Sequence, residues 1–295
     1  MDMEEYLRER RRLVDDALER HLPRDDTYPE EIHKAVRYSV FSGGKRLRPI
    51  LTLAATEAVG GDEQTAIPFA CAIEIIHTYS LIHDDLPAMD DDDLRRGKPT
   101  SHKVFGEAIA ILAGDALNTE AFNLIARETL EKGINPVLAL EIITEITDAA
   151  GLKGMVTGQV LDLEKEDQPC RPEELEFIHR HKTASLITAS VRVGARLGGA
   201  GPSELEALTN YGMAIGLAFQ IVDDLLDVEG GKEWGKVRGR DKNLSKATYP
   251  ALHGLEASRS KARELSEKAC AAIDGFDHRA DPLRSLAEYI VSRTY

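Results

Sequence analysis

The spacing of hydrophobic residues predicts helices along most of this chain. Apolar side chains recur three or four residues apart, which is the period of one helix face, and Pro or Gly stands at many of the expected ends. The expected helices cover residues 4–22, 29–42, 49–59, 64–85, 107–131, 134–150, a segment from 173 onward, 203–228 and much of 251–295. The segment 64–85 is apolar on most faces, so we expect it to be buried all round.

Signals for other fold classes are missing from the sequence. No segment keeps a period-two alternation, and there is no Asn-Gly or Asp-Gly hairpin turn, no βαβ alternation, no GxGxxG and no P-loop. Gly151, Gly154 and Gly158 indicate close helix contact or room for a ligand. No Pro-, Gly- or Ser-rich linker divides the chain. We therefore expect an all-α fold and a single domain spanning residues 1–295, large enough for a sizeable core.

Composition narrows the classes of partner. The net charge of -14 argues against nucleic acid and against an anionic membrane surface. The three cysteines, Cys71, Cys170 and Cys270, follow no metal-binding spacing. The first residues are acidic, and no apolar run reaches the roughly 18 residues that span a bilayer. We expect a cytoplasmic protein without stable membrane association.

An acidic cluster follows the apolar segment 64–85. It consists of Asp84, Asp85 and Asp90–Asp93, with Arg95 and Arg96 just beyond. Because Pro87 disfavours helix at the residue before it, we expect Asp90 to swing back on a loop. His77 falls on the same helix face as Asp84. It is therefore either a histidine of the core or a member of the same site.

A second acidic cluster ends a later predicted helix. Its members are Asp223, Asp224 and Asp227. Asp223 and Asp227 are one helical turn apart, with Gln220 between them on the helical wheel. Gly212 and Gly216 lie on the same side, so we expect a groove floored by backbone that opens at the carboxylates. The alternative is a helix contact made through small residues.

Basic residues collect in three islands, at 45–48, 95–103 and 232–246. The first follows two glycines and precedes a predicted helix N-terminus, where backbone N–H groups suit a phosphate; a solvated turn is the alternative. The third lies within residues 230–246, which contain four glycines and predict a basic loop. Two separate carboxylate sets suit Mg²⁺, which is commonly shared between one or two carboxylates and substrate phosphates. No HExxH zinc spacing or nucleophile triad is present, so we expect metal-assisted chemistry on a diphosphate with an apolar remainder.

These motifs together resemble those of trans-prenyl diphosphate synthases of the bacterial farnesyl type, from about residue 28 to the end. The matching signatures are Gly43-Gly44-Lys45-Arg46-x-Arg48-Pro49, Asp84-Asp85-x4-Asp90-x4-Arg95-Arg96, Lys182-Thr183, Gly216-x3-Gln220-x2-Asp223-Asp224-x2-Asp227 and Gly235-Lys236 through Lys246-Ala247-Thr248-Tyr249-Pro250. The resemblance implies a helical bundle with a cavity between two Asp-rich helices, and a homodimer. It also implies condensation of isopentenyl diphosphate with dimethylallyl or geranyl diphosphate to give farnesyl diphosphate.

The resemblance assigns roles to individual residues. Three Mg²⁺ ions would be held by Asp84, Asp90, Asp223 and, with direct ligation left open, Asp85, Asp224 and Asp227. The allylic diphosphate would be bound by Arg95, Lys182, Thr183, Gln220, Lys236 and Lys246. Among these, the catalytic residues would be Lys182, which stabilises the leaving diphosphate, and Thr183 and Gln220, which stabilise the carbocation. Isopentenyl diphosphate would be held by Lys45, Arg48, His77 and Arg96, and the departing diphosphate would take the final proton.

Product length and two other functions stay open. In this family the residues just before the first acidic motif limit the product, here Tyr79 and Ser80. An aromatic residue five positions before the motif resembles enzymes that stop at the C15 product, and a C20 synthase is the nearest alternative. A class I terpene cyclase and a non-catalytic subunit of a larger synthase are further alternatives. A terpene cyclase generally lacks the basic turn at 45–48, and a non-catalytic subunit usually lacks aspartates from one motif. This chain has both the basic turn and the aspartates.

Overall fold

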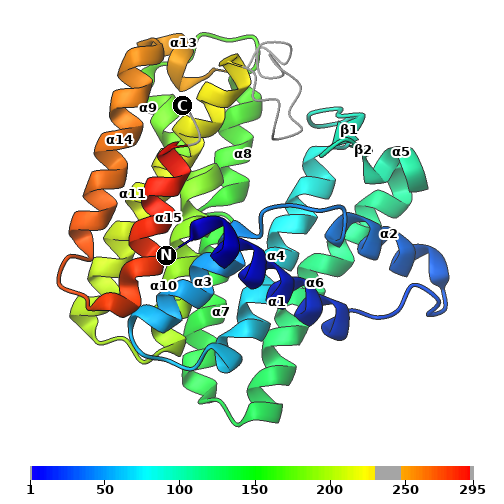
Figure 1. The fold of residues 1–295 in the computed structure, drawn as a ribbon. Helices are drawn as coiled ribbons and strands as arrows, with labels where there is room; N and C mark the ends of the chain where they lie inside the picture. The colour runs from blue at the N-terminus through cyan, green and yellow to red at the C-terminus, as the bar shows by residue number, and fades with distance from the viewer. Residues whose placement is uncertain (1, 230–246, 293–295) are drawn as a thin grey trace. The chain divides into compact units, whose positions relative to one another are not determined.

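The structure, a computed structural model, describes residues 2–229 and 247–292 and consists almost entirely of helices (Figure 1). Within these ranges the only strands are β1 (Leu94–Arg95) and β2 (Lys98–Pro99), which pair antiparallel. The prediction of an all-α fold is confirmed. The chain forms two compact units: unit 1 comprises Met1–Glu4, Leu51–Ala66 and Glu141–Tyr295, and unit 2 comprises Glu5–Ile50 and Ile67–Leu140.

Unit 2 contains the first acidic cluster. Its helices, some of which begin or end in unit 1, are α1 (Met3–His21), α2 (Glu30–Val40), α4 (Glu63–Asp84), α5 (Ser101–Phe105) and α6 (Glu107–Lys132). The prediction of a buried helix over 64–85 is confirmed, because Phe69, Ile73 and Ile76 on α4 are completely buried. Helix α4 ends at Asp84, three residues before Pro87. The core of unit 2 therefore places this acidic end at a fixed position.

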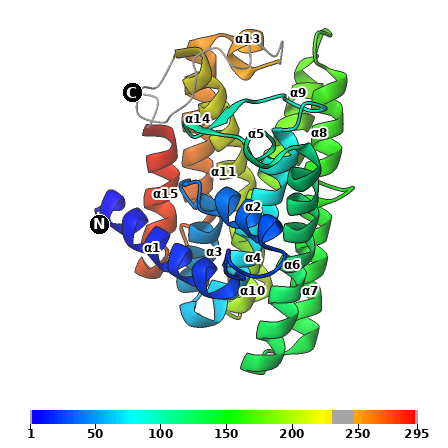
Figure 2. The same ribbon diagram turned by 90° about the vertical axis from the view of Figure 1, so that its right-hand side faces the viewer.

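Unit 1 contains the second acidic cluster. Its helices, with those shared with unit 2, are α3 (Leu47–Ala58), α7 (Pro136–Ala150), α8 (Met155–Glu164), α9 (Pro172–Ile178), α10 (Ser185–Leu197), α11 (Pro202–Glu229), α13 (Tyr249–His253), α14 (Leu255–Ala272) and α15 (Asp281–Ser292). A short 3-10 turn, η2 (His278–Ala280), precedes α15. Helix α11 packs against both α10 and α14 (Figure 2). Its buried residues Tyr211, Val222 and Leu225 anchor the helix that carries the carboxylates.

Three local features differ from the sequence prediction. A π-helical turn, η1 (His179–Ala184), interrupts the helix expected from residue 173. Arg96 and Gly97 both have positive φ angles, 55° and 76°, so they form a two-residue turn between β1 and β2 of the kind that hairpins favour. Helix α3 begins at Leu47, which leaves Pro49 in its first turn, a position where proline is tolerated.

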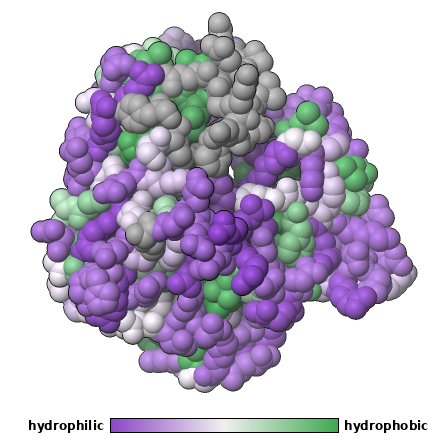
Figure 3. All heavy atoms as spheres, viewed as in Figure 1, coloured by the Kyte–Doolittle hydropathy of each residue, from purple (hydrophilic) through white to green (hydrophobic). Residues whose placement is uncertain are grey.

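Among the described residues, two helices are long and apolar enough to cross a membrane by length and composition. The expectation that no apolar stretch reaches this length is therefore wrong. In α4, 72% of the apolar window is buried inside the protein, as in a core helix, whereas in α6 the share is 39%. Helix α6 keeps Ile111, Leu112 and Leu130 exposed. On the face drawn in Figure 3, hydrophilic side chains predominate and hydrophobic patches are small.

Candidate active site

The end of α4 brings the first two predicted carboxylate positions together. The backbone N–H of Asp90 donates to the carbonyl of Asp84 at 2.9 Å, so the loop after the helix folds back as predicted. Asp85 and Asp90 are 3% and 7% exposed. Buried carboxylates need charged or hydrogen-bonding partners, and the gathering of several carboxylates makes the helix end a candidate metal site.

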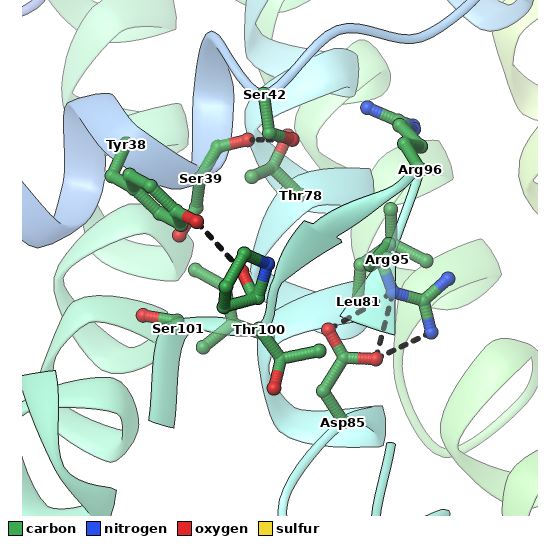
Figure 4. A pocket seen from close by; sticks show the side chains of 12 residues that line it. Tyr38, Ser39, Ser42, Thr78, Leu81, Asp85, Arg95, Arg96, Thr100 and Ser101 are labelled. Carbon is green, nitrogen blue, oxygen red and sulfur yellow. Dashed lines mark hydrogen bonds and ion pairs between the residues drawn. The ribbon is translucent and has the colours of Figure 1, made fainter. Parts of the chain in front are cut away.

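Asp85 and Arg95 form a close ion pair in unit 2. Nε of Arg95 lies 2.7 and 2.9 Å from the two carboxylate oxygens of Asp85, and one terminal guanidinium nitrogen lies 2.6 Å from Oδ1. A second, longer contact joins Arg95 to Asp92 at 3.5 Å. Figure 4 shows both Asp85 and Arg95 beside a small cavity. Asp85 therefore fixes the orientation of Arg95, whatever else it binds.

That cavity is too small for a substrate. Its volume of about 30 Å³ corresponds to roughly two water molecules. It is lined by Tyr38, Ser39, Ser42, Thr78, Leu81, Ile82, Asp85, Arg95, Arg96, Pro99, Thr100 and Ser101. The Tyr38 hydroxyl donates to the carbonyl of Pro99 at 2.7 Å, which ties α2 to the β1–β2 hairpin (Figure 4). This hydrogen bond therefore helps to hold the hairpin that carries Arg95 and Arg96.

The turn between α2 and α3 brings together most of the predicted isopentenyl diphosphate residues. The guanidinium of Arg96 donates to the carbonyl of Gly43, and a Cβ on Gly44 would lie 2.6 Å from that guanidinium. Burial, followed by the charges of Arg48 and Arg96, holds the pKa of His77 well below its usual value. The imidazole is thus neutral at pH 7 and lies among cationic side chains. Lys45, the fourth predicted residue, lies in the same turn and is partly buried.

Arg46, in the same turn, is buried and engaged by protein groups. Its guanidinium donates to Glu74 at 2.7 Å, to Asp15 at 2.8 Å and to the carbonyl of Val40 at 2.6 Å. The residue is 3% exposed and has a φ angle of 52°. Among the three basic side chains of this turn, Arg46 therefore stabilises the turn through its contacts with other protein groups.

Tyr79 and Ser80, the predicted length-limiting residues, lie on different sides of α4. The rings of Tyr79 and His83 meet edge to face, with centroids 5.9 Å apart. Burial, with a smaller contribution from Asp84, raises the pKa of Tyr79. Ser80 is 8% exposed, and its hydroxyl donates to the carbonyl of His77 at 2.9 Å. Tyr79 is thus the bulky side chain of the two, whereas the Ser80 hydroxyl is hydrogen-bonded within its own helix.

In unit 1 the π-helical turn η1 places Lys182 against α8. Nζ of Lys182 lies 2.6 Å from Oδ2 of Asp162. A Cβ on Gly158 would stand 2.3 Å from the backbone nitrogen of Lys182, so this glycine serves close helix contact. π-helical turns occur frequently at functional sites. Asp162 was not predicted, although its position one turn after Gly158 is the signal that could have indicated it.

A chain of hydrogen bonds joins the remaining predicted residues of unit 1. The hydroxyl of Thr183 donates to Oε1 of Gln220 at 2.7 Å, and Nε2 of Gln220 donates to Oδ1 of Asp224 at 2.9 Å. Oδ2 of Asp224 accepts from the backbone N–H of Tyr249 at 2.8 Å and lies 3.3 Å from Nε2 of His179. Thr183 and Asp224 are 8% and 3% exposed. The carbonyl oxygen of Gln220 is thereby held in one orientation.

His179 and Tyr249 are members of this site that the sequence did not single out. Their rings stack with centroids 6.4 Å apart. In the sequence, Tyr249 is singled out only as part of the signature that ends at Pro250. His179 stands four residues before Thr183, which is the spacing that could have indicated it.

The other carboxylates of α11 lie at the C-terminal end of the helix, but the expected groove is absent at its two glycines. Asp223 is half-buried and Asp227 is 3% exposed. A Cβ on Gly212 would stand 2.9 Å from the Cα of Thr188, and one on Gly216 would stand 2.7 Å from the Cα of Ala184. These glycines serve a helix contact, and the prediction of a backbone-floored groove is wrong there.

Two predicted residues, Lys236 and Lys246, lie outside the described residues. Within residues 2–229 and 247–292, no three metal-ligating side chains stand close enough to hold a metal by themselves. Mg²⁺ keeps several waters and relies on one or two carboxylates together with substrate phosphates. The donors at both clusters are carboxylate oxygens, the hard ligands that this ion requires.

Comparison with known proteins identifies the family of this chain. The family model described as Polyprenyl synthetase matches residues 29–278. The chain is 46% identical to the farnesyl diphosphate synthase of Geobacillus stearothermophilus, covering 100% of this chain and 99% of that one. It is 49% identical to the heterodimeric geranylgeranyl pyrophosphate synthase large subunit 1 of Arabidopsis thaliana, covering 99% and 80%. An FPP/GFPP synthase structure from Zymomonas mobilis superposes with a TM-score of 0.88 at 38% identity, covering 98% and 99%. The chain therefore belongs to the polyprenyl synthetase family.

Proposed function

We propose that this chain is a prenyltransferase that joins isopentenyl diphosphate head to tail with dimethylallyl or geranyl diphosphate. The products are (2E,6E)-farnesyl diphosphate and diphosphate. The observation that carries the proposal is the gathering of Arg48, His77 and Arg96 around one turn of unit 2, in a family member that keeps both acidic motifs. Cations beside a neutral imidazole suit a diphosphate, whose oxygens accept charge-assisted hydrogen bonds.

The carboxylates divide between metal binding and support. Asp84 and Asp90 in unit 2, and Asp223 and Asp227 in unit 1, are the residues that we propose to hold Mg²⁺, with three ions serving the reaction. Asp85 and Asp224 already accept several hydrogen bonds from protein groups, so we assign them to orienting their neighbours. When bound, Mg²⁺ neutralises the allylic diphosphate and makes it a better leaving group.

Protein groups then act at each stage of the transfer. Arg95, Lys182, Lys236 and Lys246 bind the allylic diphosphate and stabilise the charge that grows as its C–O bond breaks. The oxygens of Thr183 and Gln220 face the resulting allylic cation. That orientation is favoured because the amide of Gln220 is held by Asp224.

Isopentenyl diphosphate is held by Lys45, Arg48, His77 and Arg96 and supplies the reacting double bond. A new carbon–carbon bond forms from its π electrons. The proton lost from the adjacent carbon passes to the released diphosphate, so no protein base is required.

We propose farnesyl diphosphate as the main product because Tyr79 places a partly buried aromatic ring just before the acidic end of α4. Relatives of similar identity carry names for both farnesyl and geranylgeranyl products, so the C20 product is the alternative. Incubation with Mg²⁺, dimethylallyl diphosphate and isopentenyl diphosphate, followed by chromatography of the dephosphorylated products, tests the proposal. A C15 alcohol is expected, and a dominant C20 product would overturn the length assignment.

The same assay separates the other candidate classes. Consumption of farnesyl diphosphate without isopentenyl diphosphate would indicate a terpene cyclase and contradict the proposal. Activity that requires a second, different chain would indicate a subunit of a heteromeric synthase, as the name of the Arabidopsis relative describes for that protein. The complete acidic motifs of this chain favour activity by itself.

We further propose that residues 1–295 work as one catalytic domain of a cytoplasmic homodimer without stable membrane association. Support comes from α6 of unit 2, where Ile111 and Leu112 are 44% and 53% exposed in a helix whose apolar window is mostly unburied. Exposed apolar residues on one helix are typical of an interface. Sedimentation of the wild type should give twice the chain mass, and Leu112→Asp should lower it. A monomeric wild type would contradict the proposal.

A further inference from the structure

Helix α6 carries a glycine that backbone geometry does not require. Gly114 lies inside α6, is buried and has no positive φ angle. Glycine is among the least favourable residues for a helix interior, so this position needs another explanation. A Cβ placed there would stand 2.1 Å from Nε2 of His83 and 2.5 Å from its Cδ2. The missing side chain leaves a notch in α6, and the imidazole of His83 from α4 fills it.

Polar contacts hold the imidazole in this notch. Nε2 of His83 lies 3.1 Å from the carbonyl oxygen of Ile111. A carbonyl can only accept, so Nε2 carries the hydrogen in this contact. The carboxylate of Asp115, on the next turn of α6, lies 3.9 Å from the same nitrogen. The ring is thus held on one side by the notch and at its tip by the backbone of α6.

The other side of the imidazole meets Tyr79. The two rings are 5.9 Å apart between centroids and inclined by 75°, the edge-to-face arrangement that aromatic pairs favour. Tyr79 and His83 are four residues apart on α4 and therefore share one face. Both views of the fold place α4 beside α6 (Figures 1 and 2). A ring fixed in the notch leaves Tyr79 without room to turn toward α6.

We propose that His83, seated in the notch at Gly114, is a positioning residue that fixes the Tyr79 ring and thereby sets product length. The inference rests on the proposed function, in which Tyr79 limits the prenyl chain. His83 does not touch the reacting atoms in this assignment. It acts by keeping a length-limiting ring from moving aside when the growing chain presses against it.

The test compares product ratios across four variants: Tyr79→Ala, His83→Ala, His83→Phe and the double variant Tyr79→Ala/His83→Ala. Removing the imidazole should raise the C20 to C15 ratio about two- to tenfold, the range that an edge-to-face aromatic contact is worth, with total isopentenyl incorporation nearly unchanged. His83→Phe keeps a ring beside Tyr79 but loses the hydrogen bond to the carbonyl of Ile111, so its ratio should lie between those of the wild type and His83→Ala. His278→Ala, at an exposed histidine of unit 1, is the matched control and should change nothing.

The double variant decides whether His83 acts through Tyr79. Once Tyr79 is alanine, loss of the imidazole should change the ratio no further. An equal change in both backgrounds would overturn the inference, as would a wild-type ratio in His83→Ala when Tyr79→Ala lengthens the product. If Tyr79→Ala itself leaves length unchanged, the proposed role of Tyr79 fails first, and the two failures are therefore distinguishable.

Discussion

The buried ion pair between Arg46 and Glu74 can be used to test whether Arg46 stabilises the basic turn at residues 45–48. Both side chains are almost inaccessible, 2% and 3% exposed, and their closest atoms are 2.7 Å apart. Removing one partner of such a pair commonly costs about 3–5 kcal/mol. Glu74→Gln keeps the shape and an acceptor, and Arg46 retains Asp15 and the carbonyl of Val40. We therefore expect a loss of about 2–3 kcal/mol, below the usual range.

This loss should be visible in both stability and kinetics. At about 2–4 °C per kcal/mol for a protein of this size class, the thermal midpoint should fall by about 4–12 °C. Because Arg46 holds the turn that carries Arg48, the KM for isopentenyl diphosphate should rise about tenfold, equivalent to about 1.4 kcal/mol. The KM for the allylic substrate should change much less. Circular dichroism melting and steady-state kinetics with each substrate varied in turn measure both effects.

Two further variants serve as controls for this test. Glu131→Gln alters an exposed glutamate of α6 and should leave both quantities unchanged. The pair replacement Arg46→Met/Glu74→Leu should recover stability, since apolar residues often replace buried ion pairs without loss, but it should not restore the KM. A Glu74→Gln protein that melts within about 1 °C of the wild type and keeps its KM would refute the reasoning.

Three other predictions follow from the structure. Gly158→Ala should abolish most activity and lower the melting temperature, because the new methyl group would meet the backbone of Lys182 at 2.3 Å; a fully active variant would contradict the assigned contact. Burial lowers the pKa of His77 below its usual 6.5. Below pH 6.5 the unfolded chain therefore binds a proton at this histidine more readily than the folded chain does. The contribution of His77 to the free energy of unfolding is therefore full above pH 6.5 and is lost as the pH falls below it. Melting between pH 7.5 and 5.5 should show this slope, and His77→Gln should flatten it. Asp224→Asn should lower kcat about 10–100-fold, a loss of one positioned group, while the Mg²⁺ concentration for half-activity stays the same; a large rise in that concentration would identify Asp224 as a metal ligand.

The sequence predicted most helices because each carried its own local signals. Apolar spacing and a terminating Pro or Gly placed α4 and α6 within one or two residues of their observed ends. The π-helical turn could not be predicted in this way, because His179–Ala184 has the composition of an ordinary helix. The same limit applies to the hairpin turn at Arg96–Gly97. Its positive φ angle at arginine accompanies a hydrogen bond to Gly43, far away in the chain.

Candidate site residues were predictable by type but not by partner. The basic turn at residues 45–48 suggested a phosphate site or a solvated turn, yet Arg46 is used by Asp15 and Glu74, which are 31 and 28 residues distant. Nothing local to the turn distinguishes Arg46 from Arg48. Only the tertiary fold decides which cation is buried and paired.

The acidic motifs show a similar difference between neighbouring residues of the same type. In each unit one aspartate of an Asp-Asp pair, Asp85 or Asp224, is 3% exposed and bound by protein donors. A buried carboxylate that accepts such bonds can bind a metal only by giving them up, at a desolvation cost to the donors left behind. Its neighbour, one residue earlier, points about 100° away on the helix. We therefore expect each doubled aspartate to supply one metal ligand and one anchoring carboxylate, so that counting carboxylates in such a motif would overestimate the number of groups that hold the metal.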